Sequence, residues 1–198
     1  MPLAPRDRSP GTHHVWVGAT SHWDYFSDDV DRVAWLRLFV RTCDRFDWGP
    51  VAFCQMTTHV HALISVPDSS LADGMRYLNR EYSLEFNARH ARYGYLVRRR
   101  YGSRRIEDGR GLLRAYAYVV LNPVRAMMCR RAEDWRWSSY ATTIGLSQDF
   151  PFIDAGTAIA EAGGKTDDLR RMVSSRAAEI GREGRVRQLM PDVSGLAG

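Results

Sequence analysis

The chain has 198 residues, enough for one domain with a sizeable core, and 44% of them are hydrophobic. Its 28 basic and 23 acidic residues give a formal net charge of +5, which favours polyanionic partners. The 3 cysteines are widely spaced, which excludes a disulfide framework and a zinc-finger pattern, and no apolar run reaches membrane-spanning length. We therefore expect a soluble, cytoplasmic protein without a membrane partner.

The first half of the chain predicts strands and helices in alternation. Residues 14–20 are strand-like, and residues 51–56 and 59–66 form two further strands. Ser27 is the expected N-cap of a helix between the first two strands. We expect the buried side of that helix to carry Val30, Val33, Leu36, Val40 and Cys43. A longer helix ended by Gly94 comes next, and its apolar stripe comprises Leu71, Met75, Leu78, Tyr82 and Phe86.

The second half predicts one more extended segment and further helices. Residues 95–106 are rich in arginine and are expected to hold a strand or a hairpin, and residues 114–126 have a helical pattern. Residues 154–162 and 166–180 can each form a helix. Residues 181–198 contain many glycines and little apolar periodicity, so we expect them to be loose.

These elements follow the order strand, helix, strand, strand, helix, strand, helix. That order is typical of an α+β sandwich in which helices pack on a mainly antiparallel, ferredoxin-like sheet. We expect residues 1–145 to form this domain and residues 146–198 to form a C-terminal helical tail. The sequence shows no internal repeat and no second enzymatic domain.

The first chemical signal is the pair His59 and His61 in the third predicted strand. Side chains two residues apart on a strand point to the same face, so both imidazoles can bind one divalent cation. Val60, Ala62 and Ile64 would then face the core. Taken alone, the pair is weak evidence, because most such pairs are packed or solvated histidines.

The second signal is a polar stripe on the helix over residues 114–126. The core-facing positions of that helix are Leu113, Tyr116, Ala117, Val120, Leu121 and Val124. Positions three and four apart share a face, and the residues of the other stripe are Arg114, Tyr118, Asn122 and Arg125. A purely structural alternative stays open. In it, Tyr118 lies at the boundary between the apolar and polar faces of the helix, and Asn122 only caps a new helix started by Pro123.

The third signal is a cluster of arginines just before the tyrosine helix. Five of the eight residues from 98 to 105 are arginine, and Tyr93 and Tyr95 precede them. Such a cluster suits a phosphate backbone with a base stacked on an aromatic ring. The alternative is a solvated hairpin whose arginines form ion pairs with residues such as Glu107 and Asp108.

Three motifs, taken in order, resemble the single-tyrosine HUH transposase superfamily. They are His59-Val60-His61, the run Y-V-V-L-N-P-V-R-A over residues 118–126, and Trp135-Arg136-Trp137-Ser138-Ser139-Tyr140. More narrowly, the chain resembles the REP-associated tyrosine transposases, relatives of the IS200/IS605 transposases. The resemblance implies the HUH endonuclease fold, which is ferredoxin-like and RRM-like. It further implies Tyr118 as the nucleophile and His59, His61 and Asn122 as metal ligands. Thr58 departs from the pattern, since members often have Asn there.

The resemblance also implies a reaction and a substrate. With Mg²⁺ or Mn²⁺ as cofactor, the tyrosine of such an enzyme cleaves single-stranded DNA and forms a 5′-phosphotyrosine, leaving a free 3′-OH. The substrates are hairpins formed by REP-like palindromes, so we expect a bacterial, nucleoid-associated protein that is a monomer or a homodimer. The residues expected to contact DNA are Arg98, Arg99, Arg100, Tyr101, Arg104, Arg105, Arg114 and Arg125.

Three other functions stay open. A domesticated, non-cleaving module that binds single-stranded nucleic acid would have the same fold but would form no covalent adduct. A zinc-dependent hydrolase would use His59 and His61, but the sequence offers neither an H-E-x-x-H motif nor a nearby carboxylate ligand. A replication or mobilisation relaxase shares the chemistry, although the small size of the chain and the run over residues 121–126 disfavour it.

Overall fold

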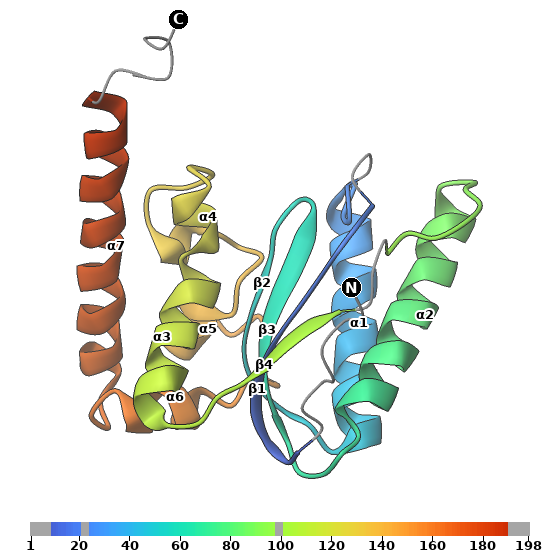
Figure 1. The fold of residues 1–198 in the computed structure, drawn as a ribbon, viewed down its shortest axis with the longest axis horizontal. Helices are drawn as coiled ribbons and strands as arrows, with labels where there is room; N and C mark the ends of the chain where they lie inside the picture. The colour runs from blue at the N-terminus through green and yellow to red at the C-terminus, as the bar shows by residue number, and fades with distance from the viewer. Residues whose placement is uncertain (1–8, 21–23, 98–100, 190–198) are drawn as a thin grey trace, which may run out of the picture.

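The computed structural model describes residues 9–20, 24–97 and 101–189, with side chains up to Arg182 (Figure 1). A sheet stands in the middle of the molecule, with helices packed on both of its faces. In chain order the elements are β1 (Gly11–Gly18), α1 (Asp29–Phe46), β2 (Gly49–Gln55), β3 (His59–Val66), α2 (Leu71–Arg89), β4 (Gly102–Arg105), α3 (Gly109–Val120), α4 (Asn122–Arg125), the 3-10 helix η1 (Ala132–Asp134), α5 (Tyr140–Thr143), α6 (Ala155–Glu161) and α7 (Thr166–Leu189).

The sheet has the strand order β2-β3-β1-β4, and all neighbouring strands are antiparallel. This arrangement confirms the predicted α+β, ferredoxin-like fold. Helices α1 and α2 lie on one face, and α3, α6 and α7 lie on the other side (Figure 1). Because side chains alternate between the two faces of a strand, every strand contributes to both sides. His61 pairs with Trp16 of β1 and with Cys54 of β2, so these three residues share the α3 face.

The first hydrophobic core lies between the sheet and helices α1 and α2. Val60, Ala62 and Ile64 enter it, as their alternation with the histidines predicts. The apolar stripe predicted for α2 is also confirmed, because all five of its residues are buried. Tyr82 adds a hydrogen bond from its hydroxyl to the carbonyl oxygen of Tyr25, at 2.6 Å.

The buried face predicted for α1 is only partly correct: Cys43 is buried and Leu36 packs against the first core, but the two valines at the start of the helix are exposed. Val30 and Val33 are each 57% exposed, whereas Trp35, Leu38 and Phe39 are buried. Both sets of residues have helical spacing, so the sequence pattern admits two orientations of the helix. The orientation adopted buries the aromatic rings, and Trp35 stacks on Phe39 with their ring centroids 4.8 Å apart. Burying the aromatic rings removes more apolar area from water than burying the valines would, so this orientation is the more stable one.

Two predicted helix boundaries differ from the structure. Asp28, not Ser27, is the N-cap of α1, and its carboxylate accepts a hydrogen bond from the backbone N–H of Asp31 at 3.1 Å. Helix α2 ends at Arg89, before the expected stop at Gly94. The chain turns at Ala91, which has a left-handed φ of 49°.

The second hydrophobic core lies between the other face of the sheet and α3. Leu63 of β3 packs there with Tyr116, Val119 and Val120 of α3. Helices α6 and α7 extend the same core through Ala158, Leu169 and Val173. Helices α6 and α7, which follow the predicted division between residues 1–145 and 146–198, therefore share the core of the domain. Helix α7 also continues to Leu189, through part of the segment expected to be loose. No helix in the described ranges is long and apolar enough to span a membrane.

The motif over residues 135–140 closes the free edge of β2. The backbone N–H of Gln55 donates to the carbonyl oxygen of Trp137 at 2.9 Å, and the indole N–H of Trp135 donates to the carbonyl oxygen of Gln55 at 3.0 Å. The guanidinium of Arg32 lies over both indole rings, at 5.7 Å from Trp135 and 5.4 Å from Trp137. These contacts assign the motif a structural role, because they satisfy backbone groups that an edge strand leaves unpaired.

Candidate active site

The predicted histidine pair lies on the α3 face of the sheet. The rings of His59 and His61 are 4.9 Å apart between centroids and nearly perpendicular, at 87°. His61 is only 6% exposed, and burial, with His14 and His59 nearby, lowers its pKa from 6.5 to about 3. Burial also lowers the pKa of His59. Both imidazoles are therefore neutral at neutral pH, the form that binds a metal ion.

A third histidine, which the sequence patterns did not single out, belongs to the same cluster. His14 Nε2 lies 3.0 Å from His61 Nδ1, within hydrogen-bonding distance. Burial and the positive charge of Arg104 lower the pKa of His14 from 6.5 to about 4. His14 lies on β1, 47 residues before His61 in the chain, and reaches it because β1 pairs with β3. His14 and Trp16 occupy alternate positions of β1 and therefore share a face. This spacing was the sequence signal that could have placed His14 on the same face as Trp16.

The hydrogen bonds of the cluster orient the two predicted metal ligands. Thr58 Oγ1 lies 3.0 Å from His59 Nδ1, and His14 occupies Nδ1 of His61. In each ring the Nε2 atom is then the nitrogen that remains for a ligand. Within the described residues, no three His, Cys, Asp or Glu side chains form a complete metal-binding group. The two imidazoles thus make an open donor pair.

Tyr118 lies directly against the histidines. Its ring centroid is 5.4 Å from that of His61 and 5.6 Å from that of His14, and the residue is 38% exposed. The guanidinium carbon of Arg125 lies 5.1 Å from the centroid of the same ring. Tyr116 is fully buried in the second core, and burial raises the pKa of its hydroxyl. Of these two tyrosines in α3, Tyr118 is therefore the one available to a substrate.

Asn122 follows Tyr118 by one helical turn, at the junction between α3 and α4. Its amide Nδ2 donates a hydrogen bond to the carbonyl oxygen of Tyr118 at 2.8 Å. The N-cap position of α4 belongs to Leu121, and no side chain caps that helix. The alternative interpretation of Asn122 as a helix N-cap is therefore wrong. The amide NH₂ group is used to hold the turn after the tyrosine, which leaves Oδ1 as the acceptor end of the side chain.

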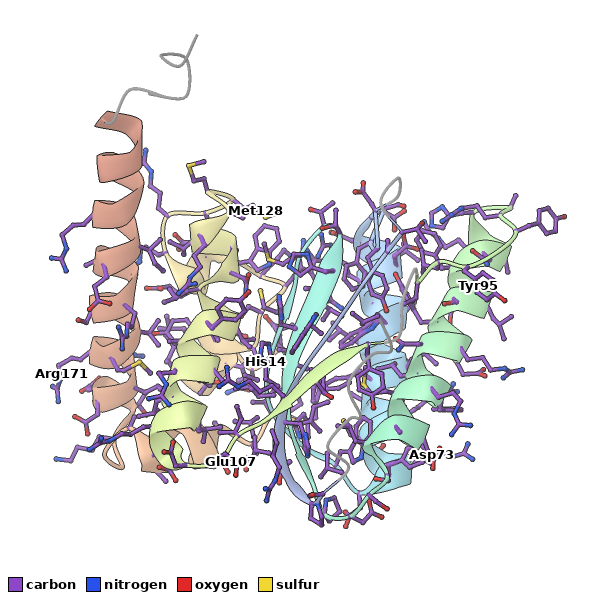
Figure 2. All side chains as sticks on the ribbon, in the orientation of Figure 1. His14, Asp73, Tyr95, Glu107, Met128 and Arg171 are labelled. Carbon is purple, nitrogen blue, oxygen red and sulfur yellow. The ribbon has the colours of Figure 1, made fainter. Side chains whose placement is uncertain are left out.

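A cavity of about 610 Å³ opens beside Tyr118. Its walls include His14, His61 and Trp16 on the sheet and Arg114 on α3. His14 lies between the sheet and α3 in Figure 2, whereas Tyr95 lies on the opposite side of the sheet, next to α2. The cavity thus joins the histidine cluster, the tyrosine and part of the basic surface.

The residues predicted to contact DNA have different positions in the structure. Arg104 and Arg114 are exposed and line the cavity. Arg105 also borders the cavity, but it is held by the carbonyl oxygen of Pro10 at 3.2 Å and by Glu107 at 3.4 Å. Tyr101 is 6% exposed and packs in the first core, which does not fit a base-contacting role. Arg98, Arg99 and Arg100 lie outside the described residues.

Comparisons with known proteins give the family and the fold of the chain. A family model described as transposase, IS200-like, matches residues 11–119, a segment that contains both predicted ligand histidines and Tyr118. The chain belongs to the IS200-like transposases. It is 26% identical over 113 residues to a Haemophilus influenzae protein named as a REP-associated tyrosine transposase. That match covers 52% of this chain and 64% of the relative, so it spans less than two thirds of the relative's length.

One solved structure shows the same fold. It is a REP-associated tyrosine transposase bound to a REP hairpin, and it matches with a TM-score of 0.65 at 14% sequence identity. The alignment covers 74% of this chain and 88% of the other chain. At this level of identity the likeness concerns the fold, and the chemistry has to be argued from the residues of this chain.

Proposed function

We propose that this protein is a single-tyrosine endonuclease and strand transferase that acts on single-stranded DNA next to hairpins formed by REP-like palindromes. The observation that carries the proposal is the contact of Tyr118 with His14 and His61 at the mouth of a cavity. An exposed phenol against neutral imidazoles provides a nucleophile beside ligands for a cation. Membership of the transposase family supports the same reaction class.

In the proposed reaction, Tyr118 Oη forms a bond to the scissile phosphorus while the bond from phosphorus to the 3′-oxygen breaks. The phenol loses its proton and the leaving 3′-oxygen gains one, so the products are a 5′-phosphotyrosine and a free 3′-OH. The guanidinium carbon of Arg125 lies 5.1 Å from the centre of the ring, so its positive charge would lie close to the phosphate that the tyrosine attacks. Reversal onto a different 3′-OH would join two strands, which separates a transposase from a simple nuclease.

We further propose that His59 and His61 hold a Mg²⁺ or Mn²⁺ ion, with Asn122 Oδ1 as an additional ligand. Such an ion, when bound, would neutralise charge on a non-bridging phosphate oxygen. The donor set fits this role because these ions keep several waters and bind substrate phosphates, so few protein ligands suffice. His14 and Thr58 would orient the two imidazoles through their Nδ1 atoms.

Hairpin DNA is the proposed substrate because the solved relative is bound to a REP hairpin. In this chain, Arg104 and Arg114 on the cavity walls can neutralise phosphates on the single strand that leads to Tyr118. The acting species is proposed to be a monomer or a homodimer.

The decisive experiment tests for the covalent adduct. A library of hairpins with randomised single-stranded flanks, labelled at the 3′ end, is incubated with the protein and Mn²⁺ and analysed by denaturing electrophoresis. We expect labelled protein with the wild type and none with Tyr118→Phe. Tyr116→Phe is the matched control in the same helix, since it removes a buried hydroxyl and should leave adduct formation intact.

Two outcomes would contradict the proposal. An adduct that persists in Tyr118→Phe and disappears in Tyr116→Phe would show that the nucleophile is misassigned. Tight hairpin binding without any adduct, in Mg²⁺ as well as Mn²⁺, would show instead a non-cleaving nucleic-acid-binding protein.

A further inference from the structure

Trp16 is an exposed aromatic residue in the interior of the sheet. It lies on β1, between His61 of β3 and Gly102 of β4, yet 40% of its surface is accessible. The one other large aromatic residue of the described strands, Phe53, is buried. A tryptophan left open beside the catalytic face carries apolar area that the fold itself does not use.

The backbone of β4 is shaped to receive this indole. A Cβ atom at Gly102 would lie 2.1 Å from Trp16 Cε2 and 2.4 Å from Trp16 Nε1, so no larger residue fits there without moving the ring. The indole therefore rests against the glycine backbone. His14 contacts it from the same strand, with the ring centroids 5.1 Å apart. The ring is thus held in place while it lines the cavity next to Tyr118.

The charges around the indole favour an anion. Arg104 on β4 and Arg114 on α3 both line the cavity, and neither forms an ion pair with another residue in the described ranges. The two acidic residues of the cavity are already engaged: Glu107 pairs with Arg105, and Asp108 caps α3 by accepting a hydrogen bond from Gly111. The cavity thus combines a fixed aromatic surface with two available guanidiniums.

We propose that this cavity is a nucleotide subsite, in which an unpaired base adjoining the scissile phosphate stacks on Trp16 while Arg104 and Arg114 bind the flanking phosphates. The inference rests on the proposed function, because it places the single strand at Tyr118. The cavity volume of about 610 Å³ lies within the range of roughly 300–1,000 Å³ that is usual for small-molecule sites. Stacking accepts any base, since every base has a π-face.

The test uses a binding signal that does not depend on cleavage. In a Tyr118→Phe background, hairpins carry 2-aminopurine at successive positions of the single-stranded tail, and its fluorescence is followed on binding. We expect strong quenching at one tail position, and loss of that quenching in Trp16→Leu. Binding of the tailed hairpin should weaken by roughly 5- to 150-fold, the loss associated with one stacked base. Trp16→Phe should fall between the parent and Trp16→Leu.

Tyr95→Leu is the matched control, since it removes an aromatic residue that is 90% exposed on the other side of the sheet. It should leave the quenching unchanged. Quenching that survives Trp16→Leu with unchanged affinity, or a parent that binds the hairpin without quenching at any tail position, would overturn the subsite. A parent that binds no hairpin would overturn both proposals. A quenched position in a protein that forms no covalent adduct would sustain the subsite and refute cleavage.

Discussion

The two faces of the sheet use the same four strands in different ways. Helices α1 and α2 cover one face, where Trp35 of α1 packs with Phe53 of β2 in the first core. On the other face, α3 packs against β2 and β3, while the part over β1 and β4 borders the cavity that contains His14 and Trp16. Strict alternation along each strand thus lets one face pack entirely into the first core, while the other face combines the second core with the cavity. The incomplete helical cover creates the candidate active site.

The largest difference between the faces should be in stability. Trp35→Ala should reduce the free energy of unfolding by about 3–5 kcal/mol, because it opens a cavity in the first core. Trp16→Ala should cost about 1 kcal/mol or less, since the residue is 40% exposed. Urea unfolding of both variants measures this contrast. Equal losses would mean that Trp16 contributes as much to the free energy of unfolding as Trp35 does.

A second prediction concerns the hydrogen bond between His14 and His61. Replacing His14 by Ala should weaken Mn²⁺ binding by about 10- to 100-fold, because residues that orient metal ligands contribute on that scale. Calorimetry on the protein without DNA gives the affinity directly. His13→Ala is the neighbouring control, since His13 points to the opposite face of the sheet. Unchanged Mn²⁺ affinity in His14→Ala would mean that His14 packs against His61 without orienting it for metal binding.

A third prediction follows from the lowered pKa values on the open face. The pKa of His61 is about 3 and that of His14 about 4, against 6.5 for a free histidine, so the unfolded chain binds more protons than the folded chain between these values. Stability should therefore be fully present above pH 6.5 and should fall as the pH drops towards 4, by up to about 1.4 kcal/mol per pH unit for each of the two histidines.

Urea unfolding at a series of pH values, with a chelator present, measures this dependence. The double variant His14→Gln and His61→Gln should show a smaller loss of stability over the same range, because both titrating groups are gone. If the wild type and the double variant lose stability in parallel, other groups control the acid response.

The smallest expected effect separates two neighbouring arginines. Arg104→Gln in a Tyr118→Phe background should reduce the salt slope of single-strand binding by roughly 0.7 in log–log terms, with no change in sequence preference. Arg105→Gln should change the slope less, because Arg105 is already held by Glu107 and the carbonyl oxygen of Pro10. Fluorescence anisotropy over a series of KCl concentrations gives both slopes. If only Arg105→Gln reduced the salt slope, the single strand would have to run outside the cavity.

Local periodicity was enough to predict much of this protein. The order of the elements, the shared face of His59 and His61, and the exposed stripe of Tyr118 next to a buried Tyr116 all follow from the spacing of residues within one element. Side-chain direction repeats with a fixed period in a strand and in a helix, so a short stretch of sequence contains the information.

Other features depended on contacts between distant segments. His14 joins the site through the pairing of β1 with β3, and Trp16 stays open because α3 covers β2 and β3 instead. The same dependence decides which stripe of α1 is buried, and why Tyr101 is in the core although it adjoins an arginine cluster. Strand register and helix orientation are set by the total area that packing buries, which no single segment specifies. The sequence by itself therefore determined the nucleophile and the histidine pair as candidates, and only the tertiary structure decided which residues surround them.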